Sequence, residues 1–277
     1  MRRLAPLLVV LALFAAGCGG GGKASPQSIL SETASNLAKI KSGTLGLSLL
    51  VSPRGTGVRG FGFELHGPFS IARSGLPVLR VAYTQIASGR QATVTLISTG
   101  RKGFVTARGK TYELPPSALD RLRTAAGSKS GVSGLNDLRV DDWVVNPKRV
   151  SCGAEAPAVE DCIQSKLNVV NAANDLLDVA QRVTGGVLPR IEGANAKQLR
   201  QSVRASKLSV RTGKKDRLLR SLVVDVDFGF QVPEILKNAL GNIVGAKVHF
   251  ALSVARANLP VSVAAPKNAL PASQYPG

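Results

Sequence analysis

Hydrophobic residues alternate with small or polar residues along most of this chain, in short runs that end near glycine. A period of two is typical of a β-strand with one buried face, and runs that follow each other at intervals of roughly ten to fifteen residues are typical of an antiparallel meander. "GKKD" has the composition of a tight turn between two late runs. The runs cover residues 44–51, 58–66, 78–87, 91–99, 102–114, 207–212, 222–230 and 246–266.

Other segments have apolar residues at helical spacing. The clearest is 168–183, where Val169, Leu176 and Leu177 share a stripe that ends before two glycines. The first such segment is 28–41, with Ser28 as a candidate N-cap and a glycine just beyond its end. Shorter helices are expected at 116–126, 193–207 and 232–243.

Strands therefore occur both before and after the helical segments. They can form one sheet with the helices gathered on one face, which predicts an α+β fold. The glycine-rich strands favour strong twist and curvature, so that the sheet approaches a half-barrel. We expect a single domain over residues 28–272, followed by a short tail at 273–277.

The N-terminus has the pattern of an export signal. Two arginines precede a short apolar segment from Leu4 to Phe14, and small residues then lead to Cys18. This arrangement resembles the lipobox of bacterial lipoproteins, in which the cysteine receives a diacylglyceryl group and becomes the new N-terminus. We therefore expect a signal peptide at 1–17, a lipidated flexible tether at 18–27 and attachment to the outer side of the cytoplasmic membrane. The alternative is an ordinary signal peptide with a chance cysteine.

The chain is strongly basic, with 36 Lys and Arg against 17 Asp and Glu and a formal charge of +19. Such a chain can meet anionic phospholipid headgroups, acidic wall polymers or nucleic acid, or it can simply have a well-solvated surface. Export argues against nucleic acid as a partner. The 8 Phe, 3 Tyr and 1 Trp also form no basic and aromatic stacking pattern.

The three cysteines have two roles. If Cys18 holds lipid, Cys152 and Cys162 remain as an even pair in an oxidising compartment, which predicts a disulfide. A zinc site is disfavoured because His66 and His249, the only histidines, have no ligand spacing with the cysteines.

No catalytic motif is present in the sequence. It lacks a Gly-x-Ser-x-Gly elbow, a His-Glu-x-x-His pair and a phosphate-binding glycine loop between strand and helix. We therefore expect no enzymatic activity and no cofactor. The alternative, an envelope hydrolase, would need acids or a serine gathered around His66 or His249.

Several strands alternate large apolar residues with small ones rather than with charges. Such a face either packs closely against helices or leaves an apolar cavity between helices and sheet, large enough for acyl chains. On the second reading the cavity wall comprises Leu47, Leu49, Phe61, Phe63, Val94, Leu96, Val169, Leu176, Leu177, Val224, Val226, Phe250, Leu252 and Val254.

Over residues 25–272 the order of motifs resembles the LppX/LprG-type lipoproteins of actinobacteria. The motifs are Cys18, "IKSGTLGLSLLV", "WVVNP", "LLDVAQRV" and "ANLPVSVAAPKNALP". The resemblance implies a LolA-like half-barrel with helices over its concave face, a cavity for multiply acylated lipids or glycolipids, and no catalytic residues. The chain departs from the family in its Cys152 and Cys162 pair and in segment 232–243, so the ligand shape and the cavity entrance stay open.

Two function classes follow. The first is a membrane-anchored carrier that takes acylated lipids or glycolipids from the membrane and carries them within the envelope, with a membrane lipid transporter as a further partner. The second is a sensing or scaffold lipoprotein that binds a protein partner through the same fold. An open cavity lined by aliphatic residues favours the first, and a closed core with an exposed apolar patch favours the second.

Overall fold

The protein forms one antiparallel sheet of 11 strands in the order β6-β5-β4-β3-β2-β1-β11-β10-β9-β8-β7. The computed structural model describes residues 24–71, 75–127, 139–153, 159–184, 189–229 and 242–274. The strands are β1 Ser42–Thr56, β2 Phe61–Ser70, β3 Val78–Ala87, β4 Arg90–Thr99, β5 Gly103–Ala107, β6 Lys110–Glu113, β7 Val144–Val150, β8 Glu160–Leu167, β9 Val203–Gly213, β10 Leu219–Gly229 and β11 Asn242–Ala255.

The chain builds this sheet in two halves that meet at its centre. From β1 the strands add outward in sequence to β6 at one edge. The chain then starts again at the other edge with β7 and adds strands inward until β11 pairs with β1, with Leu47 opposite Leu252. The outer edges are β6 and β7, so the sheet is open.

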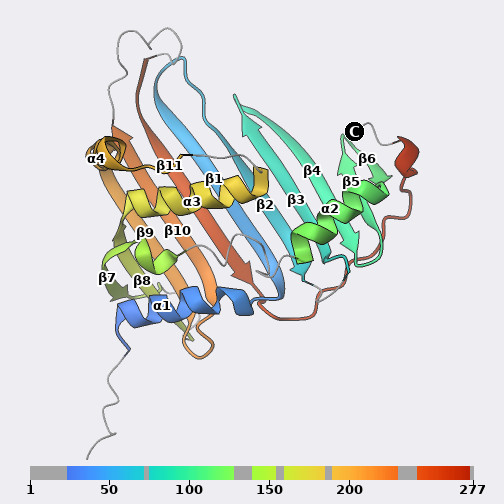
Figure 1. Ribbon diagram of the computed structural model, residues 1–277, viewed down its shortest axis with the longest axis horizontal. Coiled ribbons are helices and arrows are strands. Elements are labelled where there is room, and N and C mark those ends of the chain that lie inside the picture. The colour runs from blue at the N-terminus through green and yellow to red at the C-terminus, as the bar shows by residue number, and fades with distance from the viewer. Residues whose placement is uncertain are drawn as a thin grey trace, which may run out of the picture.

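The helices lie on one face of the sheet, as Figure 1 shows for α1, α2 and α3. Gly103 of β5 illustrates the contact with α2, because a Cβ atom there would meet the side chain of Leu119 at 2.6 Å. The helices are α1 Pro26–Asn36, α2 Pro116–Gly127, α3 Val169–Thr184 and α4 Gly193–Ser202, with 3-10 turns η1 Leu37–Lys39, η3 Val140–Asp142 and η4 Ala272–Gln274. The expected α+β class with a curved antiparallel sheet and helices is confirmed.

The first helix starts earlier than expected. Its N-cap is Ser25, whose hydroxyl accepts a hydrogen bond from the Ser28 N–H at 3.1 Å, and not Ser28 itself. Pro26 takes the first helical position, where its missing N–H costs nothing. The first helix therefore begins within segment 18–27, for which the sequence predicts a flexible tether.

The predicted helix at 193–207 is also shorter, because α4 ends at Ser202 and β9 begins at the next residue. Residues 203–207 join β9 rather than the helix because they pair with β10, as the rest of β9 does. Of the predicted helix at 232–243, residues 232–241 lie outside the described residues, and β11 already begins at Asn242.

The main core lies between α1 and the central strands. Ile29 and Leu30 of α1 are 0% and 1% exposed and pack with Leu222, Leu252 and Val254 from β10 and β11. A smaller cluster joins Val169 and Val170 of α3 to Ala196 of α4. Burial of these aliphatic side chains, at about 25 cal/mol per Å² of apolar surface, fixes the helices on this face of the sheet.

A buried polar contact joins η3 to α3. The carboxylate of Asp175, 2% exposed, accepts hydrogen bonds from Trp143 Nε1 at 2.8 Å and from the Arg139 backbone N–H at 3.1 Å. The Arg139 guanidinium also donates to it at 3.1 Å, and this hydrogen bond is the largest cause of the raised pKa of Arg139. Trp143 is 1% exposed, so the predicted extended segment around it is anchored in the core.

Candidate functional site

An apolar surface extends across β1 to β4 on the face of the sheet that carries the helices. The pairing places Leu47 beside Leu65, Leu65 beside Tyr83, and Tyr83 beside Val94, in one row across four strands. Side chains two residues apart on a strand share a face, so neighbouring rows add to the same surface. We call it the apolar stripe: Leu47, Leu49, Val51, Phe61, Phe63, Leu65, Val81, Tyr83, Val94 and Leu96.

The apolar stripe is only partly covered. Phe61, Tyr83 and Val94 are 54%, 41% and 38% exposed, and the other members are half-buried. The rings of Phe63 and Tyr83 stack with centroids 6.1 Å apart and an angle of 29° between their planes, which stabilises their positions. Large apolar side chains gathered in this way mark a binding surface more often than single exposed ones do.

The positions of the helices explain why the stripe is open. In Figure 1, α1 lies across the ends of the strands from β7 to β1, α3 crosses the middle of the central strands as far as β1 and β2, and α2 lies over the β4 and β5 side. The strands between α3 and α2 have less helical cover. Leu47 and Leu49 pack against the edge of the main core and still keep part of their surface exposed.

Six residues predicted as cavity wall belong to the stripe, and the others lie elsewhere. Leu47, Leu49, Phe61, Phe63, Val94 and Leu96 are brought together. Val224, Val226, Phe250, Leu252 and Val254 are at most 7% exposed and lie in the main core. Val169 lies in the smaller cluster, Leu176 packs against the main core, and Leu177 is half-buried on α3.

Sequence reasoning missed Val51, Leu65, Val81 and Tyr83. A signal was present in "VLRVAYTQIA", where Val81 and Tyr83 alternate with smaller residues. The alternation shows that Val81 and Tyr83 lie on the same face of β3. Only the pairing register between β2 and β3 shows that this face is also the face of Phe63.

The opposite face of the sheet is polar and contains a hollow of about 520 Å³. Leu50, Lys207, Asp225, Lys247 and His249 are among its lining residues. His249 Nδ1 lies 2.7 Å from the Asp225 carboxylate, and both side chains are substantially exposed. Among the described residues no group of three or more His, Cys, Asp or Glu is placed to hold a metal ion.

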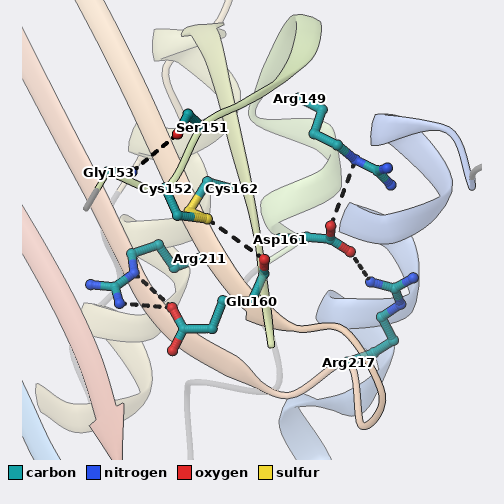
Figure 2. Close-up of a disulfide and its surroundings, with 9 residues drawn as sticks. All are labelled: Arg149, Ser151, Cys152, Gly153, Glu160, Asp161, Cys162, Arg211 and Arg217. Carbon is teal, nitrogen blue, oxygen red and sulfur yellow. Dashed lines mark hydrogen bonds and ion pairs between the residues drawn. A yellow bond between two sulfur atoms is a disulfide. The ribbon is translucent and has the colours of Figure 1, made fainter. Parts of the chain in front are cut away.

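The predicted disulfide between Cys152 and Cys162 is confirmed, with Cα atoms 5.2 Å apart. It joins the end of β7 to the start of β8 and lies within a group of ion pairs (Figure 2). Asp161 is 2.5 Å from Arg217 and 3.7 Å from Arg149, and Glu160 is 2.7 Å from Arg211. The disulfide therefore joins two strand ends whose charged side chains also form ion pairs.

A related group lies in the turn between β9 and β10. Burial by itself raises the pKa of Asp216, but hydrogen bonds from the Leu218 N–H at 3.0 Å and the Arg220 guanidinium at 2.5 Å outweigh it. The pKa of Asp216 lies below its ordinary value of 3.8 as a result. This carboxylate stays ionised at neutral pH and keeps the turn closed.

The geometry thus defines an open antiparallel sheet with helices on one face and a partly exposed apolar surface beneath them. A scan against protein-family models and a search of curated proteins found no match. Among solved structures, the chain is similar to LprF from Mycobacterium bovis, with 11% identity, a TM-score of 0.38 and coverage of 88% of this chain and 99% of that one. It is also similar to a LolA superfamily protein from Nitrosomonas europaea, with 10% identity, a TM-score of 0.19 and coverage of 86% and 96%.

Because both TM-scores lie below 0.5, neither structure transfers a residue role or a ligand to this chain. Within the described residues, no helix has the length and hydrophobicity needed to cross a bilayer. Cys18 lies outside the described residues, so its lipidation stays a prediction.

Proposed function

We propose that this protein is an extracytoplasmic lipoprotein, anchored through Cys18, that binds acylated lipids or glycolipids and carries them within the cell envelope. The observation that supports this is the apolar stripe. It presents aromatic and aliphatic side chains over four strands on the side of the sheet where helices can cover a bound chain. Binding and release are non-covalent.

The energetics favour a ligand with more than one acyl chain. Each buried methylene contributes about 0.8 kcal/mol, so ten of them contribute about 8 kcal/mol. Association costs roughly 4 to 15 kcal/mol in lost freedom of motion. A single chain therefore gives weak retention, and two or three chains give tight retention.

Native mass spectrometry tests the proposal. The mature chain from residue 18, with Cys18→Ser to prevent lipidation, is produced in an oxidising compartment, and copurifying material is extracted with organic solvent. We expect a discrete mass excess that extracts as acylated lipid. A chain that stays free of lipid after incubation with envelope lipids would contradict the carrier function.

A paired set of variants locates the binding surface. Phe61→Asp with Val94→Asp places two carboxylates on exposed positions of the apolar stripe, and we expect lipid affinity to fall by about tenfold or more, because a charge in apolar contact is costly. The control is Val145→Asp with Leu259→Asp, at positions 39% and 47% exposed and outside the stripe. Equal lipid occupancy in the two double variants would exclude the stripe as the binding surface.

A second candidate function uses the same surface. The main core beneath α1 is well packed, with side chains close to 0% exposed, while the stripe is open. This combination also fits a scaffold lipoprotein that docks a protein partner on the stripe. The two are separated by the extraction experiment, since a scaffold purifies without lipid and takes up none.

A further inference from the structure

The described chain begins at one end of the sheet. The carbonyl oxygen of Ala24 accepts a hydrogen bond from the Arg149 guanidinium at 3.0 Å, close to the end of β7. From there α1 crosses the neighbouring strand ends, with Glu32 3.3 Å from Arg217 and Asn36 donating to the carbonyl of Asp216 at 3.2 Å. We call this the tether-side end of the domain: α1, η1, the start of β1, the end of β7, the start of β8 and the β9–β10 turn.

The tether-side end has an excess of positive charge. Its described acidic residues, Glu32, Glu160, Asp161 and Asp216, are held in ion pairs with arginines. The exposed side chains of Lys39, Lys41 and Lys215 form no ion pair with any other described residue. The basic residues of this end are Lys39, Lys41, Lys148, Arg149, Arg211, Lys214, Lys215, Arg217 and Arg220.

The chain between Cys18 and Ala24 decides which surface can reach the membrane. Even fully extended, six residues span only about 20 Å. At physiological ionic strength attraction to charged headgroups acts over about 8 Å. The 15-residue strand β1 is roughly 50 Å long at about 3.3 Å per residue, so basic residues at its other end lie outside this range when the tether-side end is near the bilayer.

We propose that the tether-side end is a docking surface for the anionic phospholipid headgroups of the membrane that holds Cys18. The inference rests on the proposed function only through the Cys18 anchor and not through the apolar stripe. Each lysine or arginine close to such a surface adds to the attraction. The disulfide joins the ends of β7 and β8 at this surface, and the Asp161–Arg217 ion pair joins β8 to the β9–β10 turn. With this end on the bilayer, Phe61 at the opposite end of β2 lies on the side away from the membrane.

Vesicle cosedimentation with two matched triple variants tests the surface. Both are built on the mature chain with Cys18→Ser and are mixed with vesicles of phosphatidylcholine containing phosphatidylglycerol. The test variant carries Lys39→Glu, Lys41→Glu and Lys215→Glu. The control carries Lys110→Glu, Lys166→Glu and Lys197→Glu, three exposed lysines at the other end of the sheet and on α4. The two variants have the same net charge.

We expect the test variant to bind anionic vesicles about tenfold or more weakly than the parent chain, and the control to stay within about threefold. Equal losses in both variants would mean that binding follows net charge alone and would overturn the docking surface, as would no loss in either. Extraction of bound lipid from the same preparations reports on the carrier function separately. A chain with no lipid cargo but end-specific vesicle binding would exclude the carrier and keep the docking surface.

Discussion

Gly67 shows how closely two strands of this sheet approach each other. The residue is buried in β2 with a φ of +152°, and a Cβ atom there would lie 2.0 Å from the carbonyl oxygen of Arg80. Neither the backbone conformation nor the space admits a side chain. Gly57, in the turn after β1, also has positive φ, at +77°, but has nothing within 4 Å of a Cβ position.

Alanine substitutions at Gly57 and Gly67 separate the cost of backbone strain from the cost of a clash with a neighbouring strand. We expect Gly57→Ala to lower the free energy of unfolding by about 1 kcal/mol from strain alone. Gly67→Ala should lower it by about 3 kcal/mol or more, because β3 must also move. Urea unfolding of both variants measures the difference, and equal losses would show that the close approach at Gly67 does not matter.

Asp216 predicts a pH dependence of stability. Its pKa is lowered in the folded state, so its contribution is fully present above the unfolded pKa near 3.8 and is lost as the pH falls through the lower folded value. We expect Asp216→Asn to cost about 1 kcal/mol at pH 7, since the carboxylate is partly exposed, and less at pH 3. Urea unfolding at both pH values checks this. The same cost at pH 3 and pH 7 would contradict the assignment.

At the scale of elements, the contact between η3 and α3 depends on one buried carboxylate. Asp175→Ala leaves the Trp143 indole N–H and the Arg139 backbone N–H without this acceptor, and it leaves the Arg139 guanidinium with Asp142 as its ion-pair partner. We expect a loss of about 3 kcal/mol in the free energy of unfolding.

A double-mutant cycle with Trp143→Phe separates the hydrogen bond from the loss of volume. We expect a coupling energy of about 1 to 2 kcal/mol between positions 143 and 175. If the two substitutions lower the free energy of unfolding additively, the 2.8 Å hydrogen bond from Trp143 Nε1 to Asp175 contributes little to stability.

Elements were predictable where the pattern was local. Alternation in "TLGLSLLV" and "LVVDVDFGF" identified β1 and β10 because each strand has one buried face. Helix boundaries were less accurate. Ser25 outcompetes Ser28 as N-cap because Pro26 fits the first helical position, and the last residues expected in α4 pair with β10 instead.

At the scale of the whole molecule, the division between core and open surface could not be predicted. Phe63 and Phe250 lie in similar alternating strands, yet Phe250 is 7% exposed in the main core and Phe63 is half-buried in the apolar stripe. The difference comes from where the helices α1 and α3 lie over the sheet. That placement depends on contacts between distant segments, such as Thr33 with Thr212, which no local pattern contains.

The meeting of β1 and β11 at the centre of the sheet has a consequence for folding. The strands from β1 to β6 can pair as they emerge, and β7 to β10 can pair later, but the central ladder waits for the last strand of the chain. Pairing over such sequence separation is slow, and until it forms, β1 and β10 both expose unpaired backbone that can recruit other chains. We infer that the newly made chain passes through an interval of exposure to aggregation that ends only when β11 pairs with β1 and β10. A chain truncated before residue 242 would contain two separate half-sheets, each with a long exposed edge.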